Sequence, residues 1–315
     1  MSDNYLFVGL GAIGYPMASN IRKRIPSTST LYIYDVYVPT LERFVAEYGA
    51  LGPIKAVKSV KEGAADAKVV ISIVPTADNV RQVYLDETSG LIGAGKEPER
   101  LILECSTIES AKSKEIGEKL KEGGYGTYVD TPVSGGVIVA GAGTLSFMIG
   151  AAKGSSGHER IHEVLSMMGS PAKFFWCGKL GVALAAKIAN NYLSCSFLLL
   201  IVEAFAMGVR CGVDPHILHE VIQNSSGQSF MGDHVCPVPG VVSHAPSSNN
   251  WKLGFKTQMM IKDVGLGAEA ARQVGIEPRM ADTAIAIWKE AAQDPRCVDK
   301  DGSSIWLRIN DIKDE

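Results

Sequence analysis

The sequence is poor in cysteine, and its cysteines do not occur at the spacings that metal or redox motifs require. Only six of the 315 residues are cysteines, and no two of them form a C-x-x-C pair. This scattered arrangement argues against a disulfide framework and against a zinc framework. We therefore expect reduced thiols in an intracellular protein.

The sequence also lacks an uninterrupted apolar run of the about 20 residues that a membrane span requires. Its most apolar stretch, residues 188–202, contains Asn190 and Asn191 and lies between Lys187 and Glu203. We predict that this stretch belongs to a core helix and that the protein has no membrane partner.

No targeting segment is expected either. The first ten residues, MSDNYLFVGL, lead directly into a predicted strand. This pattern leaves no room for a secretory signal or an Arg-rich transit peptide. The expected location is cytoplasmic; the alternative is mitochondrial, with a transit peptide that is absent from this chain.

An excess of basic residues is missing as well. The formal net charge is −3, which argues against a surface built to bind nucleic acid. Apolar residues make up 46% and charged residues 21% of the chain, an ordinary balance for a globular protein. The length predicts one large domain or two medium ones.

Short β-branched runs alternate with helix-like stretches, such as residues 12–25 and 110–122, in the first part of the chain. This alternation predicts a parallel sheet covered by helices on both faces. The strand pattern ends near Gly181, and the rest of the chain predicts helices only. The predicted strands are residues 5–10, 30–35, 69–75, 101–106, 127–132, 145–150 and 172–178. The predicted C-terminal helices are residues 182–211, 215–224, 252–274 and 279–292.

Residues 9–14 read GLGAIG and fill the pattern G-x-G-x-x-G. An apolar strand precedes them and a helix follows, which is the setting in which this loop binds a pyrophosphate at a helix N-terminus. The alternative is a purely structural turn. The predicted cofactor loop consists of Gly9, Leu10, Gly11, Ala12, Ile13 and Gly14.

Asp35 ends the next predicted strand, about 20 residues after the glycine loop. Its carboxylate can accept hydrogen bonds from both ribose hydroxyls and would repel a 2′-phosphate. No arginine follows it in the stretch YDVYVP. These features predict NAD as the cofactor, in preference to NADP.

Four blocks recur at characteristic positions: GLGAIGYPMASN (9–20), DTPVSGGVIVAGAGTLSFMIG (130–150), GKLGVALAAKIANN (178–191) and GFKTQMMIKDVGLGAEAA (254–271). In order and spacing they resemble the β-hydroxyacid dehydrogenase family, whose members oxidise a small β-hydroxy acid with a nicotinamide cofactor. The resemblance implies a Rossmann-like N-terminal domain, here residues 1–180, and an all-α C-terminal domain, here residues 181–315, joined by a long interdomain helix.

The stretch SSGQSFMGDHVCPVPGV, residues 225–241, is similar to the 3-hydroxyisobutyrate branch of that family. The implied reaction is the NAD-dependent oxidation of 3-hydroxyisobutyrate to methylmalonate semialdehyde, a step of valine degradation. One alternative is a reductase of another small semialdehyde, of the tartronate, succinic or glyoxylate type. Another is a Rossmann protein that binds a nucleotide without turnover.

The resemblance also implies the remaining site residues. Ser134, Gly135 and Gly136 of the PVSGG segment would bind the substrate carboxylate, since two glycines expose backbone N–H donors and the serine adds a hydroxyl. Lys262 would approach the cofactor or the substrate. The residues Val74, Pro75 and Thr107 would line the cofactor cleft.

Lys187 would be the catalytic residue, and Asn191 would orient the substrate. The two are four apart in a predicted helix, so they share a face and can reach one ligand. A charged lysine can give a proton to an alkoxide during reduction, and a neutral one can take it during oxidation. Burial and nearby positive charge would lower its pKa. The alternative is a lysine that snorkels to water at the helix edge.

Two further patterns bear on metals and on assembly. Residues 158–162 read HERIH and match the H-E-x-x-H zinc pattern, but they fall in a predicted connecting helix, so we expect packing there and no metal. The helix predicted at 182–211 carries more apolar surface than one helix stripe needs. We therefore expect a homodimer or a homotetramer.

Overall fold

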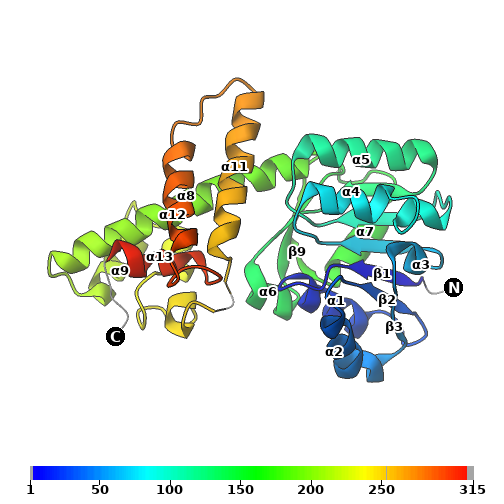
Figure 1. Ribbon diagram of the computed structural model, residues 1–315, viewed down its shortest axis with the longest axis horizontal. Helices are drawn as coiled ribbons and strands as arrows, with labels where there is room; N and C mark the ends of the chain where they lie inside the picture. Colours follow the sequence, from blue (N-terminus) through cyan, green and yellow to red (C-terminus); the bar gives the residue numbers. More distant parts are fainter. Residues whose placement is uncertain (1–2, 253, 311–315) are drawn as a thin grey trace. The chain divides into compact units, whose positions relative to one another are not determined.

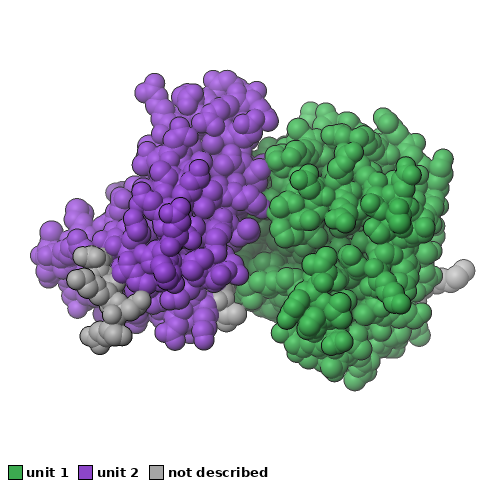
Figure 2. All heavy atoms as spheres, in the orientation of Figure 1, with its two compact units in different colours: residues 1–187 green, residues 188–315 purple. Residues whose placement is uncertain are grey.

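The computed structural model describes residues 3–252 and 254–310. The chain forms two compact units, residues 1–187 and 188–315 (Figures 1 and 2). They divide inside helix α8 (Val182–Arg210), C-terminal to the boundary expected at 180/181. That expected boundary stays a prediction.

A six-stranded parallel sheet forms the centre of the first unit. Its strand order is β3-β2-β1-β4-β5-β6, so the order reverses at β1, which pairs with β2 on one side and with β4 on the other. The strands are β1 (Tyr5–Val8), β2 (Leu31–Tyr34), β3 (Ile54–Ala56), β4 (Val69–Ser72), β5 (Leu101–Glu104) and β6 (Thr127–Asp130). All but β3 lie where strands were predicted. β3 has three residues and none of them is buried, so it carries little hydrophobic signal.

Helices cover both faces of this sheet, as the alternating pattern predicted (Figure 1). Successive strand residues point to opposite faces: Phe7 packs with the residues of α1 and α2, and Leu6 with those of α3 and α4. The helices of this unit are α1 (Gly14–Arg24), α2 (Val38–Tyr48), α3 (Val60–Ala64), α4 (Ala77–Leu85), α5 (Ser110–Gly123), α6 (Gly136–Ala142) and α7 (His158–Ser166).

A second, smaller sheet follows in the order β7-β8-β9. It contains β7 (Val133–Ser134), β8 (Leu145–Ile149) and β9 (Gly169–Trp176). The two strands predicted at 145–150 and 172–178 are therefore present, and they form a sheet of their own with β7. The backbone N–H of Met148 in β8 donates to the carbonyl of Pro132 at 3.1 Å. This bond holds the small sheet against the segment that follows β6 in the chain.

The H-E-x-x-H segment lies in α7 and packs against β9. The His158 ring stacks on Trp176 with 4.1 Å between ring centroids, and His162 meets Phe174 edge-on at 5.4 Å. His158 also accepts the Gly154 backbone N–H through Nδ1 at 3.1 Å. Both histidines thus have packing partners that account for their positions.

In the described part of the second unit, helices are the regular structure, as predicted. They are the C-terminal part of α8, α9 (Pro215–Gln223), α10 (Phe230–His234), α11 (Thr257–Gln273), α12 (Ala281–Gln293) and α13 (Ile305–Ile309). Trp288 and Phe205 are fully buried at its core. The helix predicted at 252–274 begins only at Thr257, because Asp301 accepts the Phe255 N–H at 2.7 Å and holds the preceding backbone outside the helix. The five-residue helices α10 and α13 were not predicted.

Helix α8 is partly covered. By length and composition it could cross a membrane, yet its most apolar window is 39% buried. Leu198 and Val202 face the core of the second unit, whereas Leu193, Leu200 and Met207 are 53%, 52% and 66% exposed. Among the described residues, none covers this apolar face of α8, which is therefore open.

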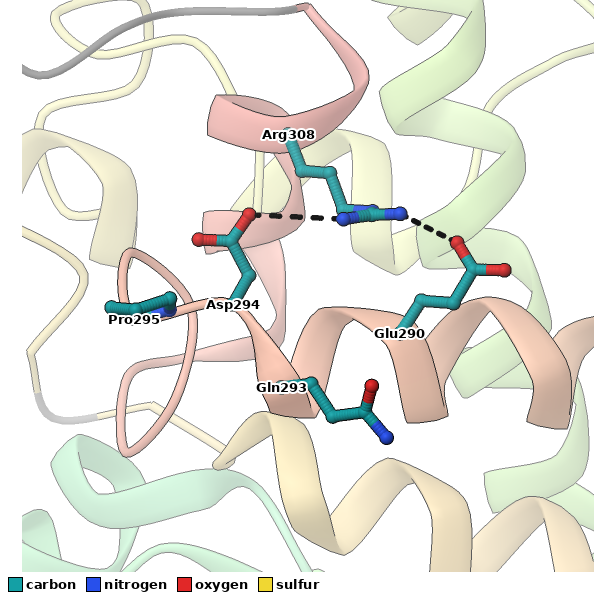
Figure 3. Close-up of a pocket in the computed structure, with 5 residues that line it drawn as sticks. All are labelled: Glu290, Gln293, Asp294, Pro295 and Arg308. Atoms are coloured by element: carbon teal, nitrogen blue, oxygen red, sulfur yellow. Dashed lines mark hydrogen bonds and ion pairs between the residues drawn. The ribbon is translucent and has the colours of Figure 1, made fainter.

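A hollow of about 320 Å³ lies beside α12 and α13 (Figure 3). Arg308 reaches Glu290 at 2.6 Å and Asp294 at 3.9 Å. Hydrogen bonds from Arg296 lower the pKa of the Asp294 carboxyl to about 2. The charged groups that line the hollow are thus paired with one another or with Arg296, and this cluster joins the end of α12 to α13.

Candidate active site

The glycine loop has the geometry of a phosphate-binding turn. Gly9 has a φ of +92°, and a Cβ there would lie 2.2 Å from the Ile73 carbonyl oxygen. A Cβ at Gly14 would lie 1.9 Å from the Gly9 carbonyl oxygen. A Cβ at Gly11 would meet no described atom within 4 Å. The outer glycines thus serve the turn and the packing, and the middle one leaves space for a ligand to approach the backbone.

Helix α1 starts directly after this turn, at Gly14. In the described structure no side chain caps its N-terminus, and no acidic residue stands in its first turn. Its first N–H groups and the positive end of the helix dipole therefore favour an anion. The residues present fit the pyrophosphate of a dinucleotide.

Asp35 follows β2 and bonds to the glycine loop. Its Oδ2 accepts the Leu10 N–H at 2.6 Å, and its Oδ1 accepts the Tyr37 N–H at 2.8 Å. Each carboxylate oxygen can accept a second hydrogen bond, so both retain capacity for ribose hydroxyls. Asp35 therefore also positions the loop, which the sequence pattern alone did not indicate.

The segments that contain Val74 and Thr107 are held by a buried network at the ends of β4 and β5. The Ser106 hydroxyl accepts the Val74 N–H at 2.7 Å, and the Ser106 N–H donates to Glu104 at 2.7 Å. The Ser72 hydroxyl donates to the other carboxylate oxygen of Glu104. Burial raises the pKa of the Glu104 carboxyl. Sequence reasoning missed Glu104, although an acidic residue at the end of the apolar strand LILE was a usable signal.

These three loops follow β1, β4 and β5, which are neighbours in the sheet. The carboxyl ends of these strands lie at one edge of the sheet, beside β1, where the strand order reverses. Open α/β sheets bind their ligands outside the carboxyl ends of the strands at such a reversal. The structure therefore brings Gly9–Gly14, Val74–Pro75 and Thr107 to one edge of the sheet.

The PVSGG segment runs from β7 into α6. Gly135 and Gly136 have φ values of +139° and +74°, and residues other than glycine rarely adopt such values. A Cβ at Gly135 would lie 2.6 Å from Val139 Cγ1, whereas one at Gly136 would meet no described atom within 4 Å. The segment therefore has open space on the Gly136 side. Its carboxylate-binding role stays a prediction.

Lys187 and Asn191 lie four residues apart in α8 and are 7% and 8% exposed. A lysine that snorkels keeps its ammonium group in water, so this degree of burial argues against that alternative. An ammonium group can be buried at this depth when partners compensate its charge. The catalytic role of Lys187 stays a prediction.

In the second unit, Asp263 connects Asn191 with Lys262. The Asn191 side-chain amide donates to Asp263 Oδ2, and the Lys262 ammonium lies 3.5 Å from Asp263 Oδ1. The Asp263 side chain is 2% exposed. The structure thus brings two predicted site residues together through a third, Asp263, which sequence reasoning did not single out within the block at residues 254–271.

Two family models match the chain. The NAD-binding domain of 6-phosphogluconate dehydrogenase matches residues 4–178, and the NAD-binding domain of NADP-dependent 3-hydroxyisobutyrate dehydrogenase matches residues 181–307. The mitochondrial 3-hydroxyisobutyrate dehydrogenase of Homo sapiens is 36% identical over 84% of this chain and 74% of that protein. The chain belongs to the β-hydroxyacid dehydrogenase family.

Other members of the β-hydroxyacid dehydrogenase family are equally similar. The NAD-dependent L-serine dehydrogenase of Pseudomonas aeruginosa is 35% identical, with 90% of both chains covered. A solved structure of 3-hydroxyisobutyrate dehydrogenase from Mycobacterium tuberculosis with L-serine is 32% identical, with a TM-score of 0.81 and 98% and 99% of the two chains covered. These relatives confirm the family and the fold that the sequence blocks predicted.

The chain is therefore a β-hydroxyacid dehydrogenase that uses a nicotinamide dinucleotide, NAD(P). This confirms the predicted class of cofactor and of enzyme.

Proposed function

We propose that this β-hydroxyacid dehydrogenase oxidises 3-hydroxyisobutyrate to methylmalonate semialdehyde with NAD, as a step of valine degradation. The observation that carries the proposal is the burial of Lys187, 7% exposed, one helical turn before Asn191 in α8. A buried lysine beside a polar amide is suited to hold and accept the proton of a substrate hydroxyl.

In the proposed reaction, Ser134, Gly135 and Gly136 hold the substrate carboxylate through the serine hydroxyl and backbone N–H groups. Asn191 orients the hydroxyl-bearing carbon, and neutral Lys187 accepts the hydroxyl proton at Nζ. NAD, when bound, accepts the hydride from that carbon. The products are the semialdehyde, NADH and one proton, so atoms and charge balance.

The choice between 3-hydroxyisobutyrate and L-serine depends on one substituent, because both contain the unit HO–CH₂–CH–COO⁻. 3-Hydroxyisobutyrate carries a methyl group where L-serine carries an ammonium group. Residues 225–241 are similar to the 3-hydroxyisobutyrate branch of the family, and a 36%-identical relative is named as a 3-hydroxyisobutyrate dehydrogenase. These similarities favour the methyl substituent. L-serine is the second candidate, since a 35%-identical relative is named as an L-serine dehydrogenase.

A substrate panel tests this choice. We expect kcat/KM with NAD to be about tenfold or more higher for 3-hydroxyisobutyrate than for L-serine or 3-hydroxypropionate, since a methyl group in an apolar pocket is worth about 10–200-fold. The methyl ester of 3-hydroxyisobutyrate should be a poor substrate, because it lacks the carboxylate charge. NADH absorbance follows each reaction. A higher kcat/KM for L-serine would replace the proposed substrate, and equal turnover of the ester would refute the role of the PVSGG segment.

We propose NAD over NADP because of the Asp35 carboxylate. A 2′-phosphate beside it would place like charges together, which costs several kcal/mol by typical estimates. The same charge argues against a semialdehyde reductase that uses NADPH. The residues after Asp35, Val36 and Tyr37, are 88% and 65% exposed and carry no positive charge that could offset this repulsion.

Asp35→Asn tests the cofactor preference. The amide oxygen can still accept one backbone N–H bond, but the charge is gone, so the ratio of kcat/KM for NAD to that for NADP should fall at least about tenfold. Asp86→Asn is the matched control, because Asp86 also accepts backbone N–H bonds, from Thr88 and Ser89. A wild-type preference for NADP, or an unchanged ratio in Asp35→Asn, would contradict the proposal.

Lys187→Met tests the proton transfer. Methionine keeps the apolar stem and removes the ammonium group, so kcat should fall by about 10²–10⁴ while NAD affinity is retained. Lys187→Arg should restore little, because arginine scarcely loses its proton. The pH profile of oxidation should rise through an apparent pKa that is absent in Lys187→Met. Lys119→Met, at an exposed ion pair with Glu115, is the control. Retention of kcat in Lys187→Met would refute the catalytic role.

We further propose that the protein is a homodimer or a homotetramer and that the open face of α8 is covered by a second copy. This face contains Leu193, Phe197, Leu200 and Met207, each at least 40% exposed. Contiguous exposed apolar side chains of this kind mark interaction surfaces.

Light scattering after size exclusion tests the assembly. The wild type should elute as a dimer or a tetramer at micromolar concentration. Leu200→Glu should shift it to a smaller species, because a buried unpaired carboxylate is costly. Val274→Glu, at a side chain that is 72% exposed beyond the end of α11, should leave the mass unchanged. A monomeric wild type would refute this proposal.

A further inference from the structure

The N-terminus of α8 is capped by a side chain from a distant strand. Gly181 precedes the helix, and its carbonyl accepts the first helical bond from the Ala185 N–H at 3.2 Å. Gly181 has a φ of +84° and no side chain with which to cap. Asp130, the last residue of β6, accepts the Gly181 N–H through Oδ1 at 2.9 Å and the Leu184 N–H through Oδ2 at 3.0 Å.

These are the two N–H groups, of the N-cap and of the third helical residue, that a capping box satisfies with local side chains. Here one carboxylate satisfies both. Other helices have local caps: Thr76 caps α4, and Asp214 caps α9. The cap of α8 differs because it joins the helix to the main sheet.

The first unit is shaped to accommodate this carboxylate. Asp130 is 0% exposed, and its carbonyl accepts the Gly150 N–H at 2.9 Å. A Cβ at Gly150 would lie 1.7 Å from Asp130 Oδ1, so only glycine leaves the space. Burial raises the pKa of the Asp130 carboxyl, which means that its charge costs free energy in the folded state. A local Ser or Asp cap would provide the same stability without that cost.

The two elements that Asp130 joins are both parts of the proposed site. Asp130 stands four residues before Ser134, at the end of the strand that leads into the PVSGG segment. Its partner Leu184 lies three residues, or one helical turn, before Lys187. We infer that Asp130 is a positioning residue, which fixes the start and register of α8 and so sets Lys187 relative to the carboxylate-binding segment. This inference rests on the proposed function.

Asp130→Asn is the direct test. The amide keeps the shape of the carboxyl, but it presents one acceptor and one NH₂ group, so one of the two cap bonds is lost. A shift of about 1 Å in a reacting group can cost about 100-fold in rate. We expect kcat to fall about tenfold to a hundredfold, with NAD affinity unchanged and the melting temperature within about 4 °C of the wild type.

Asp214→Asn is the matched control. Asp214 also accepts two backbone N–H bonds at a helix N-terminus, from His216 at 2.9 Å and Ile217 at 3.2 Å, but α9 carries no proposed site residue. Its variant should keep kcat within about twofold of the wild type. If Asp130→Asn lowers kcat no more than Asp214→Asn does, the inference is refuted.

A double variant separates positioning from a general structural effect. If Asp130 acts through Lys187, then Asp130→Asn should lower kcat no further in the Lys187→Met background, because variants that act on one unit are not additive. An additional tenfold loss in that background would overturn the inference. Should Lys187→Met keep its kcat, the proposed lysine role fails and the inference fails with it. Should Lys187→Met lose its kcat while Asp130→Asn keeps that of the wild type, only the role of Asp130 is refuted.

Ser110→Ala carries the test if Asp130→Asn does not fold. The Ser110 hydroxyl donates to the Gly181 carbonyl, so this variant loosens the start of α8 from the other side without changing a buried charge. We expect kcat to fall several-fold with NAD affinity unchanged. A kcat equal to that of the wild type would refute the positioning of Lys187 through Gly181.

Discussion

Loops at the carboxyl edge of a parallel sheet contain backbone N–H groups that find no carbonyl partner on a neighbouring strand. In this protein, acidic side chains accept hydrogen bonds from several of these groups. Asp35 follows β2 and bonds to the glycine loop, Glu104 ends β5 and bonds to the segment before Thr107, and Asp130 ends β6 and bonds to the start of α8. Buried N–H groups without partners would each cost about 1–3 kcal/mol. The positions of the cofactor loops and of Lys187 therefore depend on these carboxyl groups.

The direction of a carboxyl group's pKa shift shows whether its ionisation weakens or stabilises the folded state. Burial raises the pKa of Glu104 and of Asp130, so ionisation of these groups weakens the folded state. Hydrogen bonds from Arg296 lower the pKa of Asp294 to about 2, so its ionisation stabilises the folded state. The charges of Glu104 and Asp130 thus lower the stability of the folded state, while their hydrogen bonds fix the segments that they contact. Such a combination is common near functional sites.

Much of the fold was predictable because it rests on local patterns. The β-branched runs marked five of the six strands of the main sheet, and the apolar run after Gly181 marked α8. Short elements were missed: β3 and α10 contain too few buried residues for a hydrophobic period. The start of α11 was placed too early, because Asp301, 46 residues after Phe255 in the chain, holds the backbone before the helix.

The sequence by itself determined the family, the order of the elements and the chemistry available, because glycine spacing, the acidic end of β2 and a lysine four residues before an asparagine are local properties. The tertiary structure alone decided which side chains position that chemistry. Glu104, Asp130 and Asp263 contact partners that are distant in the chain, namely Ser72 on the neighbouring strand β4, Leu184 at the start of α8 and Asn191 further along α8. Such contacts leave no periodic signal in one sequence, because the chain brings the partners together only when it folds.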